Sequence, residues 1–486
     1  MKSDTKHKIA FWSTIIAGVL VLLAISAFFI HRWTTNINLN DVVQNKVVQK
    51  QIKKRVNPQN RFLLSLAPTF LGFDEPKTYL LLFLNNTELR PGGGFIGSYA
   101  TLKVSKGKIN IISQQGVEKL DSQTPKDWRP KPPDILKEEL KVDRWYFRDS
   151  NWSPDFAKSS NKGLKFYKNE GGAKSEDIDF VVGITTTVLE ELLKIVGPIE
   201  VESIEFSDSN VIKKLQYQVH YGFKERGQSF RNRKQIMKPF LKKLSQKVQS
   251  GLLQNYQNYL DLAREMFKEK HVVIYSPQQK TQQTIEANNL GGRVVEKPVG
   301  DYLMWVDANL AALKTDHAIE RNMTYQIRKK DGDYIATAKM KYNHTGNFDW
   351  RTSRYRTFAR VYTPTGTEFI SAKLENKEIN KEGIQMGEEL NKKWFGKFTQ
   401  IEPQQSKTLS FTYKLPDRIA QDIKNGSYNL VAQKQIGTLK PQLTLELYFG
   451  KNITNANPAE LEKYWGDSKY NLKTNLKQDR KFKLTF

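Results

Sequence analysis

Residues 78–109 have the sequence TYLLLFLNNTELRPGGGFIGSYATLKVSKGKI, and this stretch decides how the chain is expected to fold. The apolar run Tyr79–Leu84 is typical of a fully buried strand. The run Tyr99–Val104 alternates polar and apolar residues, which is typical of a half-exposed strand, and the Lys106-Gly107 pair after it predicts a turn. The stretch therefore predicts two strands joined by a polar, glycine-rich segment.

The polar segment between these strands is the first candidate site. Three consecutive glycines leave the backbone free to adopt positive φ and leave room for a ligand to approach main-chain N–H groups. A carboxylate and a guanidinium stand two residues apart beside them. The alternative is a tight glycine turn with acidic and basic side chains on the surface. The candidate ligand-binding residues of this segment are Asn85, Asn86, Glu88, Arg90, Gly92, Gly93 and Gly94.

Composition narrows the class of protein and of partner. A chain of 486 residues is too long for one ordinary domain. Lys and Arg number 77 against 51 Asp and Glu, which gives a net charge of +26 and favours anionic partners. The absence of cysteine excludes disulfides, thiolate metal sites and a cysteine nucleophile.

The N-terminus predicts a membrane anchor. Residues 9–30 form an uncharged apolar run of 22 residues, which is long enough to cross a bilayer as a helix. Lys2, Lys6 and Lys8 precede it, so the positive-inside rule places the N-terminus in the cytoplasm and the bulk of the chain outside. A cleavable signal peptide is the alternative, but this run is longer than an ordinary signal h-region of about 7–15 residues. We therefore expect a single-pass protein of the cell membrane.

The rest of the chain predicts two domains after the anchor (1–32) and a stalk (33–60). Residues 61–316 alternate apolar strands with amphipathic helices, as in Ile178–Gly183 followed by Thr185–Val196, which predicts an α/β layered domain. Residues 317–486 contain many short alternating strands between turns, which predicts an all-β sandwich.

A second candidate site lies in a basic region of the α/β domain. Arg231, Arg233 and Lys234 follow Ser229, which can cap a helix, so these cations are expected in its first turns together with free N–H groups that favour anions. A solvated helix face is the alternative. Asp155 is a further candidate at the mouth of a site, or else caps a helix that starts near Ser153-Pro154.

Several of these stretches resemble one protein family. The sequences NNTELRPGGGFIGSY, NWSPDF, LLKIVGPIEV and GDYLMWVDANLAALKTD, with a C-terminal β region, together resemble the bacterial domain-of-unknown-function family 4012. The resemblance covers nearly all of residues 60–486. It implies a membrane-anchored protein and does not imply a reaction.

The order of elements also resembles, more weakly, the LytR-CpsA-Psr (LCP) phosphotransferases. Those enzymes move anionic glycopolymers from polyprenyl-pyrophosphate carriers onto the cell wall. The resemblance implies an LCP-like α/β domain in which Glu88 and Arg90 are catalytic candidates and Glu88 could hold Mg²⁺. It also implies that the segment Arg231–Gln235 clamps a pyrophosphate, since Arg binds phosphate oxygens in pairs.

This sequence departs from the LCP pattern where catalysis would need it. Asn85 and Asn86 stand in place of an aspartate, and a neutral amide ligates Mg²⁺ less well and cannot act as a base. We therefore expect binding of an anionic cell-wall polymer or a polyprenyl-linked glycan more than its transfer. The alternative is a non-catalytic surface module that binds through the β-sandwich. Nucleic-acid binding rests on charge alone and has the least support.

Overall fold

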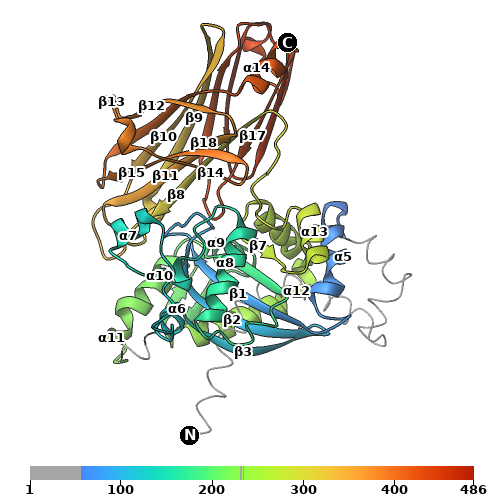
Figure 1. Cartoon of the computed structure of the whole chain (residues 1–486). Helices are drawn as coiled ribbons and strands as arrows, with labels where there is room; N and C mark the ends of the chain where they lie inside the picture. Colours follow the sequence, from blue (N-terminus) through green and yellow to red (C-terminus); the bar gives the residue numbers. More distant parts are fainter. Residues whose placement is uncertain (1–55, 230–232, 234) are drawn as a thin grey trace. The chain divides into compact units, whose positions relative to one another are not determined.

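The computed structural model describes residues 56–229, 233 and 235–486 (Figure 1). The predicted anchor, residues 9–30, lies outside the described residues. Among the helices that are described, none is both long and apolar enough to cross a membrane. The chain divides into two compact units. Within the described residues, the α/β unit comprises 56–84, 96–128 and 160–291, and the sandwich unit comprises 85–95, 129–159 and 292–486.

The α/β unit is built on a five-stranded mixed sheet. β1 and β4 are parallel, whereas β4 pairs antiparallel with β7 and β2 pairs antiparallel with β3. The strands in sheet order are β3 (Lys108–Gly116), β2 (Phe95–Ser105), β1 (Lys77–Asn85), β4 (Phe180–Thr185) and β7 (Val272–Tyr275). β1 and β4 are almost wholly buried, as their continuous apolar sequences predict.

Helices cover both faces of this sheet. On one face Ala100 and Val182 share a core with Leu192 of α9 and Phe240 of α12. On the other face Tyr167 of α8 donates to or accepts from Thr101, with 2.6 Å between the two hydroxyls. The described α-helices up to residue 291 are α5 (Arg61–Phe70), α6 (Val117–Asp121), α7 (Asp134–Leu140), α8 (Phe156–Asn169), α9 (Thr187–Val196), α10 (Val211–Tyr217), α11 (Phe223–Glu225), α12 (Met237–Lys268) and α13 (Gln279–Ala287), and a small hairpin is formed by β5 (Ile199–Val201) and β6 (Ile204–Phe206).

The basic helix begins later than the sequence predicts. We expected it to start at Ser229, but α12 begins at Met237. Pro239 explains the difference, because a proline lacks the N–H that a helix interior requires and is tolerated in the first turn only. Arg233 therefore precedes the helix and does not lie in its first turn.

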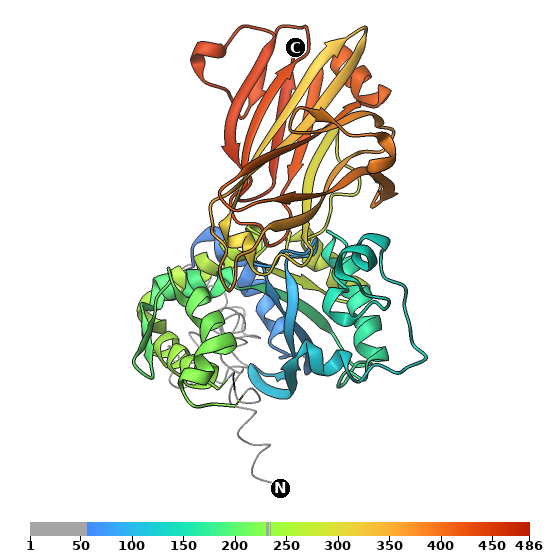
Figure 2. The same ribbon diagram turned by 90° about the vertical axis from the view of Figure 1, so that its left-hand side faces the viewer.

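The sandwich unit packs two seven-stranded sheets face to face (Figure 2). Large apolar side chains such as Trp305, Phe395 and Phe411 fill the space between the sheets. The first, here called the open sheet, has the order β13 (Lys377–Glu378), β12 (Glu368–Leu374), β16 (Ser406–Lys414), β10 (Asp333–His344), β9 (Ile319–Lys330), β18 (Gln442–Tyr448) and β20 (Lys469–Asn475). The second, the covered sheet, has the order β14 (Gln385–Glu389), β15 (Lys392–Ile401), β11 (Tyr355–Pro364), β8 (Asp301–Asn309), β17 (Ser427–Gln433), β21 (Arg480–Thr485) and β19 (Asn455–Asn457). α14 (Asp417–Lys424) connects β16 to β17.

The two sheets differ on their outer faces. Segments from outside the sheets pack on the covered sheet: Val294 lies against Tyr302 and Met304, and Leu136 of α7 lies against Phe358. On the open sheet the outward residues are mostly polar and are partly or fully exposed, as the alternating burial of β10 shows. The sandwich thus has one outer face buried by its own chain and one outer face open to solvent.

The mixed α/β architecture with a β-rich C-terminal region is confirmed, but the domain boundary differs from the expected one. We expected residues 61–316 to form the α/β domain. Instead β8 pairs with β11 and β17 inside the covered sheet, and residues 85–95 and 129–159 also belong to the sandwich unit. Every residue of β8 is buried, so its sequence pattern fits an inner strand of the α/β sheet as well as of the sandwich.

Candidate functional site

The polar segment after β1 is anchored within the sandwich unit through Arg90. The Arg90 side chain is only 3% exposed. Its Nε donates to Asp149 Oδ1 at 3.0 Å, its Nη1 donates to the Asn309 carbonyl at 2.6 Å, and its Nη2 lies 3.4 Å from Glu88 Oε1. All three nitrogens of this predicted anion ligand are therefore engaged by the protein itself.

Glu88 and Lys314 are two partly buried charges of opposite sign in the same neighbourhood. Burial raises the pKa of Glu88, and the nearby charges of Arg90 and Lys314 oppose the increase. Burial lowers the pKa of Lys314, and Glu88 opposes the decrease. Such shifts are common at functional sites and also in structural ion-pair networks. Among the described residues, no three His, Asp or Glu side chains are grouped so that they could hold a metal ion.

The three glycines make room for other parts of the chain. Gly93 and Gly94 have φ of 118° and 151°, in the region that favours glycine. A Cβ on Gly437 would lie 2.0 Å from the carbonyl oxygen of Gly93, and a Cβ on Gly94 would lie 2.7 Å from the carbonyl oxygen of Asn85. Both distances are too short for a side chain. Asn86 Nδ2 donates to the Gly437 carbonyl at 2.9 Å. The close approach predicted for a ligand is made here by the loop after β17.

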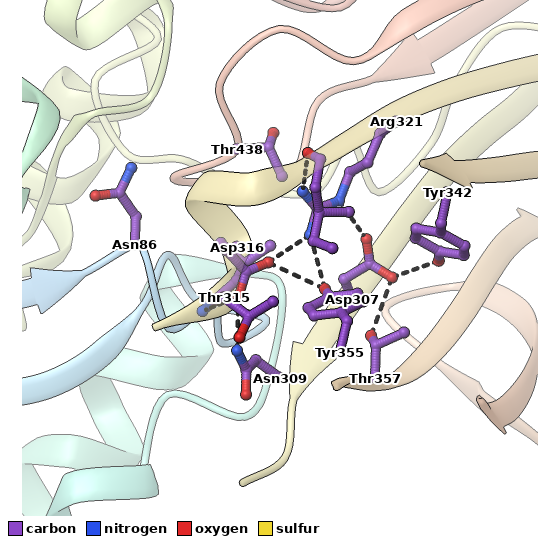
Figure 3. Close-up of polar contacts among 12 residues, drawn as sticks. Asn86, Asp307, Asn309, Thr315, Asp316, Arg321, Tyr342, Tyr355, Thr357 and Thr438 are labelled. Carbon is purple, nitrogen blue, oxygen red and sulfur yellow. Dashed lines mark hydrogen bonds and ion pairs between the residues drawn. The ribbon is translucent and has the colours of Figure 1, made fainter. Parts of the chain in front are cut away.

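Behind this segment lies a buried polar network centred on Arg321 (Figure 3). Arg321 Nε donates to Asp307 Oδ2 at 2.7 Å, and Arg321 Nη2 donates to Asp316 Oδ1. All three side chains are less than one-tenth exposed. The arginine thus joins strand β9 to strand β8 and to the turn that precedes β9.

Hydroxyl and amide groups complete this network. Asp307 Oδ1 accepts from Tyr342 at 2.6 Å and from Thr357 at 3.1 Å. Asp316 accepts from the Tyr355 hydroxyl at 3.0 Å, from Asn309 Nδ2 at 2.8 Å and from the Leu89 backbone N–H at 3.0 Å. Because the Leu89 contact belongs to the polar segment, the network also fixes that segment to the sandwich.

The remaining predicted residues do not join the polar segment in one described cluster. Asp155 is 1% exposed; its Oδ1 accepts from the Lys158 N–H at 2.9 Å, which caps α8, and its Oδ2 pairs with Arg293 Nε at 2.9 Å. Arg233 belongs to the α/β unit and pairs with Glu118 at 3.4 Å. Arg231 and Lys234 lie outside the described residues. The pyrophosphate clamp stays a prediction.

Comparison with known proteins supports one of the two resemblances. Residues 74–220 match a protein family model described as "Protein of unknown function (DUF4012)". This is the family expected from the sequence, over the segment that holds the glycine loop. No curated protein matches the chain.

Solved structures with similar parts share little sequence with this chain. A candidate nutrient binding protein from Legionella pneumophila is 9% identical, with a TM-score of 0.27, covering 38% of this chain and 71% of its own. Leukotriene A4 hydrolase from Saccharomyces cerevisiae is 7% identical, with a TM-score of 0.21, covering 36% of this chain and 28% of its own. Aminopeptidase A from Legionella pneumophila is 8% identical, with a TM-score of 0.20, covering 35% of this chain and 21% of its own.

The open sheet carries a basic, polar surface that sequence analysis did not identify. Its outward side chains are mainly hydroxyls, amides and cations, with the acids Glu320 and Glu446 accepting from the amides of Asn343 and Gln326. One row crosses six neighbouring strands, from β12 to β20, and consists of Lys373, Ser410, Lys339, Thr324, Thr444 and Lys473. We call the outward side of the open sheet the basic face.

Most cations of the basic face have no acidic partner, whereas Lys414 at the end of β16 pairs with Asp333 Oδ1 at 3.0 Å. Within the described part of the chain, no ion pair is made by Lys339, Lys341, Lys373, Lys469, Lys473 or Arg328. By strand geometry, Lys339 and Lys341 are about 7 Å apart along β10, and Lys339 and Lys473 about 14 Å apart across the sheet. These are spacings over which one extended polyanion can contact several cations together.

The sequence contained a signal for this face. Thr337, Lys339 and Lys341 alternate with the buried residues of β10, and this period of two marks one side of a half-buried strand. The rows across strands could not be found in this way, because strand order and register place residues from six separate segments side by side.

Proposed function

We propose that this chain is a membrane-anchored cell-envelope protein that binds an anionic polymer through the basic face of its sandwich unit. The observation that supports this proposal is the set of unpaired cations on an open sheet face. The expected anchor at residues 9–30 and the net charge of +26 agree with a partner outside the cytoplasm that carries many negative charges.

The chemistry of the basic face suits an extended polymer. Each lysine ammonium is a hydrated point charge that accepts several geometries, so a repeating anion needs no single exact pose. Thr and Ser hydroxyls between the lysines can donate to anionic oxygens, and they can accept from polymer hydroxyls. Since these charges are exposed, each contributes little alone and salt screens it, so affinity must arise from many contacts.

We do not extend this proposal to a transfer reaction of LCP type. Arg90, which the resemblance assigns to phosphate, has its three nitrogens engaged within the protein. Glu88, the catalytic candidate and candidate metal ligand, faces that same guanidinium.

The proposal is tested by removing charge from the basic face. The full chain and a Lys339→Gln, Lys341→Gln, Lys473→Gln variant are titrated with inorganic polyphosphate at low and at physiological salt. We expect the variant to lose about tenfold or more in affinity at low salt, because three cations that face the polymer are gone. We also expect the parent's affinity to fall as salt rises.

A charge-matched control distinguishes the effect of the basic face from the effect of the protein's net charge. Lys137, Lys280 and Lys424 are exposed and lie off the basic face, so their replacement by Gln removes the same charge elsewhere. This control should bind polyphosphate within about twofold of the parent, as expected for charges far from the polymer. Equal losses in the two triple variants would show that binding depends on net charge alone and would overturn the proposal.

A further inference from the structure

A groove opens at one end of the basic face. Its volume is about 330 Å³, and strands β9, β18 and β20 form it. The side chains of Arg328, Glu446, Tyr448, Lys469 and Asn471 line it. It therefore contains an aromatic ring as well as charged groups, unlike the rows of lysine and threonine beside it.

The aromatic ring of the groove stands between two cations. Tyr448 pairs in register with Arg328 of β9 on one side and with Lys469 of β20 on the other. The Tyr448 side chain is 40% exposed at the end of its strand. Neighbouring strands are about 4.8 Å apart, so the backbone positions of both cations are one strand spacing from that of Tyr448.

A second exposed aromatic group lies on the loop 458–468, which leads into β20. Trp465 is 61% exposed there, and its indole Nε1 donates to the Glu460 carbonyl at 3.1 Å, which fixes the ring. The Glu460 carboxylate accepts from the Asn471 N–H at 2.8 Å. Since Asn471 lines the groove, this contact fastens the loop beside it.

The charge of the loop indicates what an exposed tryptophan could bind. Residues 458–468 contain three acids, Glu460, Glu462 and Asp467, against one base, Lys463. A negative loop is repelled by an anionic lipid surface, whereas basic residues are typical of loops that insert there. In a glycan the anionic groups and the sugar rings are separate, so neutral rings can face the acidic loop while the anionic groups face Arg328 and Lys469 of the groove.

We propose that the groove and its loop form a sugar-binding subsite at the end of the basic face. The faces of Tyr448 and Trp465 stack on the C–H faces of sugar rings, whose slightly positive hydrogens match the negative face of an aromatic ring. Arg328 and Lys469 hold anionic groups carried by the same sugars. This inference rests on the proposed function and narrows the ligand from any polyanion to an anionic glycan.

The test compares two anionic polymers, of which only one contains sugars. The full chain and a Tyr448→Ala, Trp465→Ala variant are titrated with dextran sulfate and with inorganic polyphosphate. We expect the double variant to bind dextran sulfate about tenfold more weakly and polyphosphate within about twofold of the parent. A Tyr448→Phe, Trp465→Phe variant keeps both rings and should retain dextran sulfate binding within about threefold.

An exposed aromatic residue elsewhere in the sandwich unit supplies the control. Phe348 is 66% exposed, and Phe348→Ala should leave both affinities unchanged. If the alanine double variant binds both polymers as the parent does, or weakens both equally, the sugar subsite is overturned while the basic face stands. If the parent binds neither polymer, the proposed function itself fails.

Discussion

At the scale of single residues, Asp301 is a buried carboxyl group whose pKa departs from its usual range. Its carboxylate is fully buried between the sheets, where Oδ2 accepts from the hydroxyls of Tyr325 and Tyr428, each at 2.7 Å. Burial raises the pKa of Asp301 to about 6, although these hydrogen bonds and the backbone N–H of Tyr302 oppose the increase. The folded protein therefore binds a proton at a pH where the unfolded chain has released it.

This shift predicts a specific pH dependence of stability. Between about pH 4 and 6 the folded state holds more protons at Asp301 than the unfolded state, so the free energy of unfolding falls as pH rises through that window. The loss from this one group is at most about 3 kcal/mol. Denaturant unfolding followed at several pH values should show it in the parent and not in Asp301→Asn.

A second variant checks the cause. Tyr325→Phe removes a hydroxyl that stabilises the ionised carboxylate, so the pKa of Asp301 in the folded state should rise and the upper end of the pH window should move upward relative to the parent. An Asp301→Asn protein whose stability follows the same pH curve as the parent would show that another group is responsible.

At the scale of secondary-structure elements, strand β9 depends on a single guanidinium. Arg321 is the cation shared by Asp307 on β8 and Asp316 in the turn before β9. Arg321→Met would leave two carboxylates buried without a cation. We expect a loss of about 3–5 kcal/mol in the free energy of unfolding, measured by denaturant titration.

The matched control for this substitution lies on the same strand. Arg328 is exposed on the basic face and makes no ion pair within the described residues, so Arg328→Gln should change stability by no more than about 0.5 kcal/mol. A similar small effect for Arg321→Met would mean that the two carboxylates find other partners or become protonated at little cost.

The elements that could be predicted were those with strong local signals. The hairpin of β9 and β10 follows from alternating residues around the Asp331-Gly332 turn, and both residues adopt positive φ there. The α9 helix ends at Gly197, as its Gly-Pro signal predicts. By contrast, the role of Arg90 could not be predicted, because Asp149 and Asn309 are distant in sequence and only the folded chain brings them to its guanidinium.

At the scale of the whole molecule, the β-sandwich is not a continuous segment of the chain. The chain passes between the two units five times, the last time at residue 292. A fragment of residues 317–486 matches the domain expected from the sequence but lacks β8. Two strands, β11 and β17, would then lose their common neighbour.

We therefore expect fragments 317–486 and 292–486 to behave differently. The shorter fragment should lack a cooperative thermal transition by near-UV circular dichroism, because the inner edges of β11 and β17 are unpaired. The longer fragment restores β8 and should regain such a transition, at a lower temperature than the full chain. A cooperative transition in fragment 317–486 equal to that of 292–486 would contradict the assignment of β8 to the sandwich.

The discontinuous sandwich also determines when each part of the protein can fold during its synthesis. Asn86 binds a carbonyl that lies 351 residues later in the chain, and Arg90 binds one that lies 219 residues later. Because the ribosome adds about 5–20 residues per second, Asn309 is synthesised roughly 10–40 s after the glycine loop, and Gly437 later still. Contacts of such long range also slow refolding. The loop near the start of the described chain is thus among the last parts to become ordered, and its folding depends on the completion of the C-terminus.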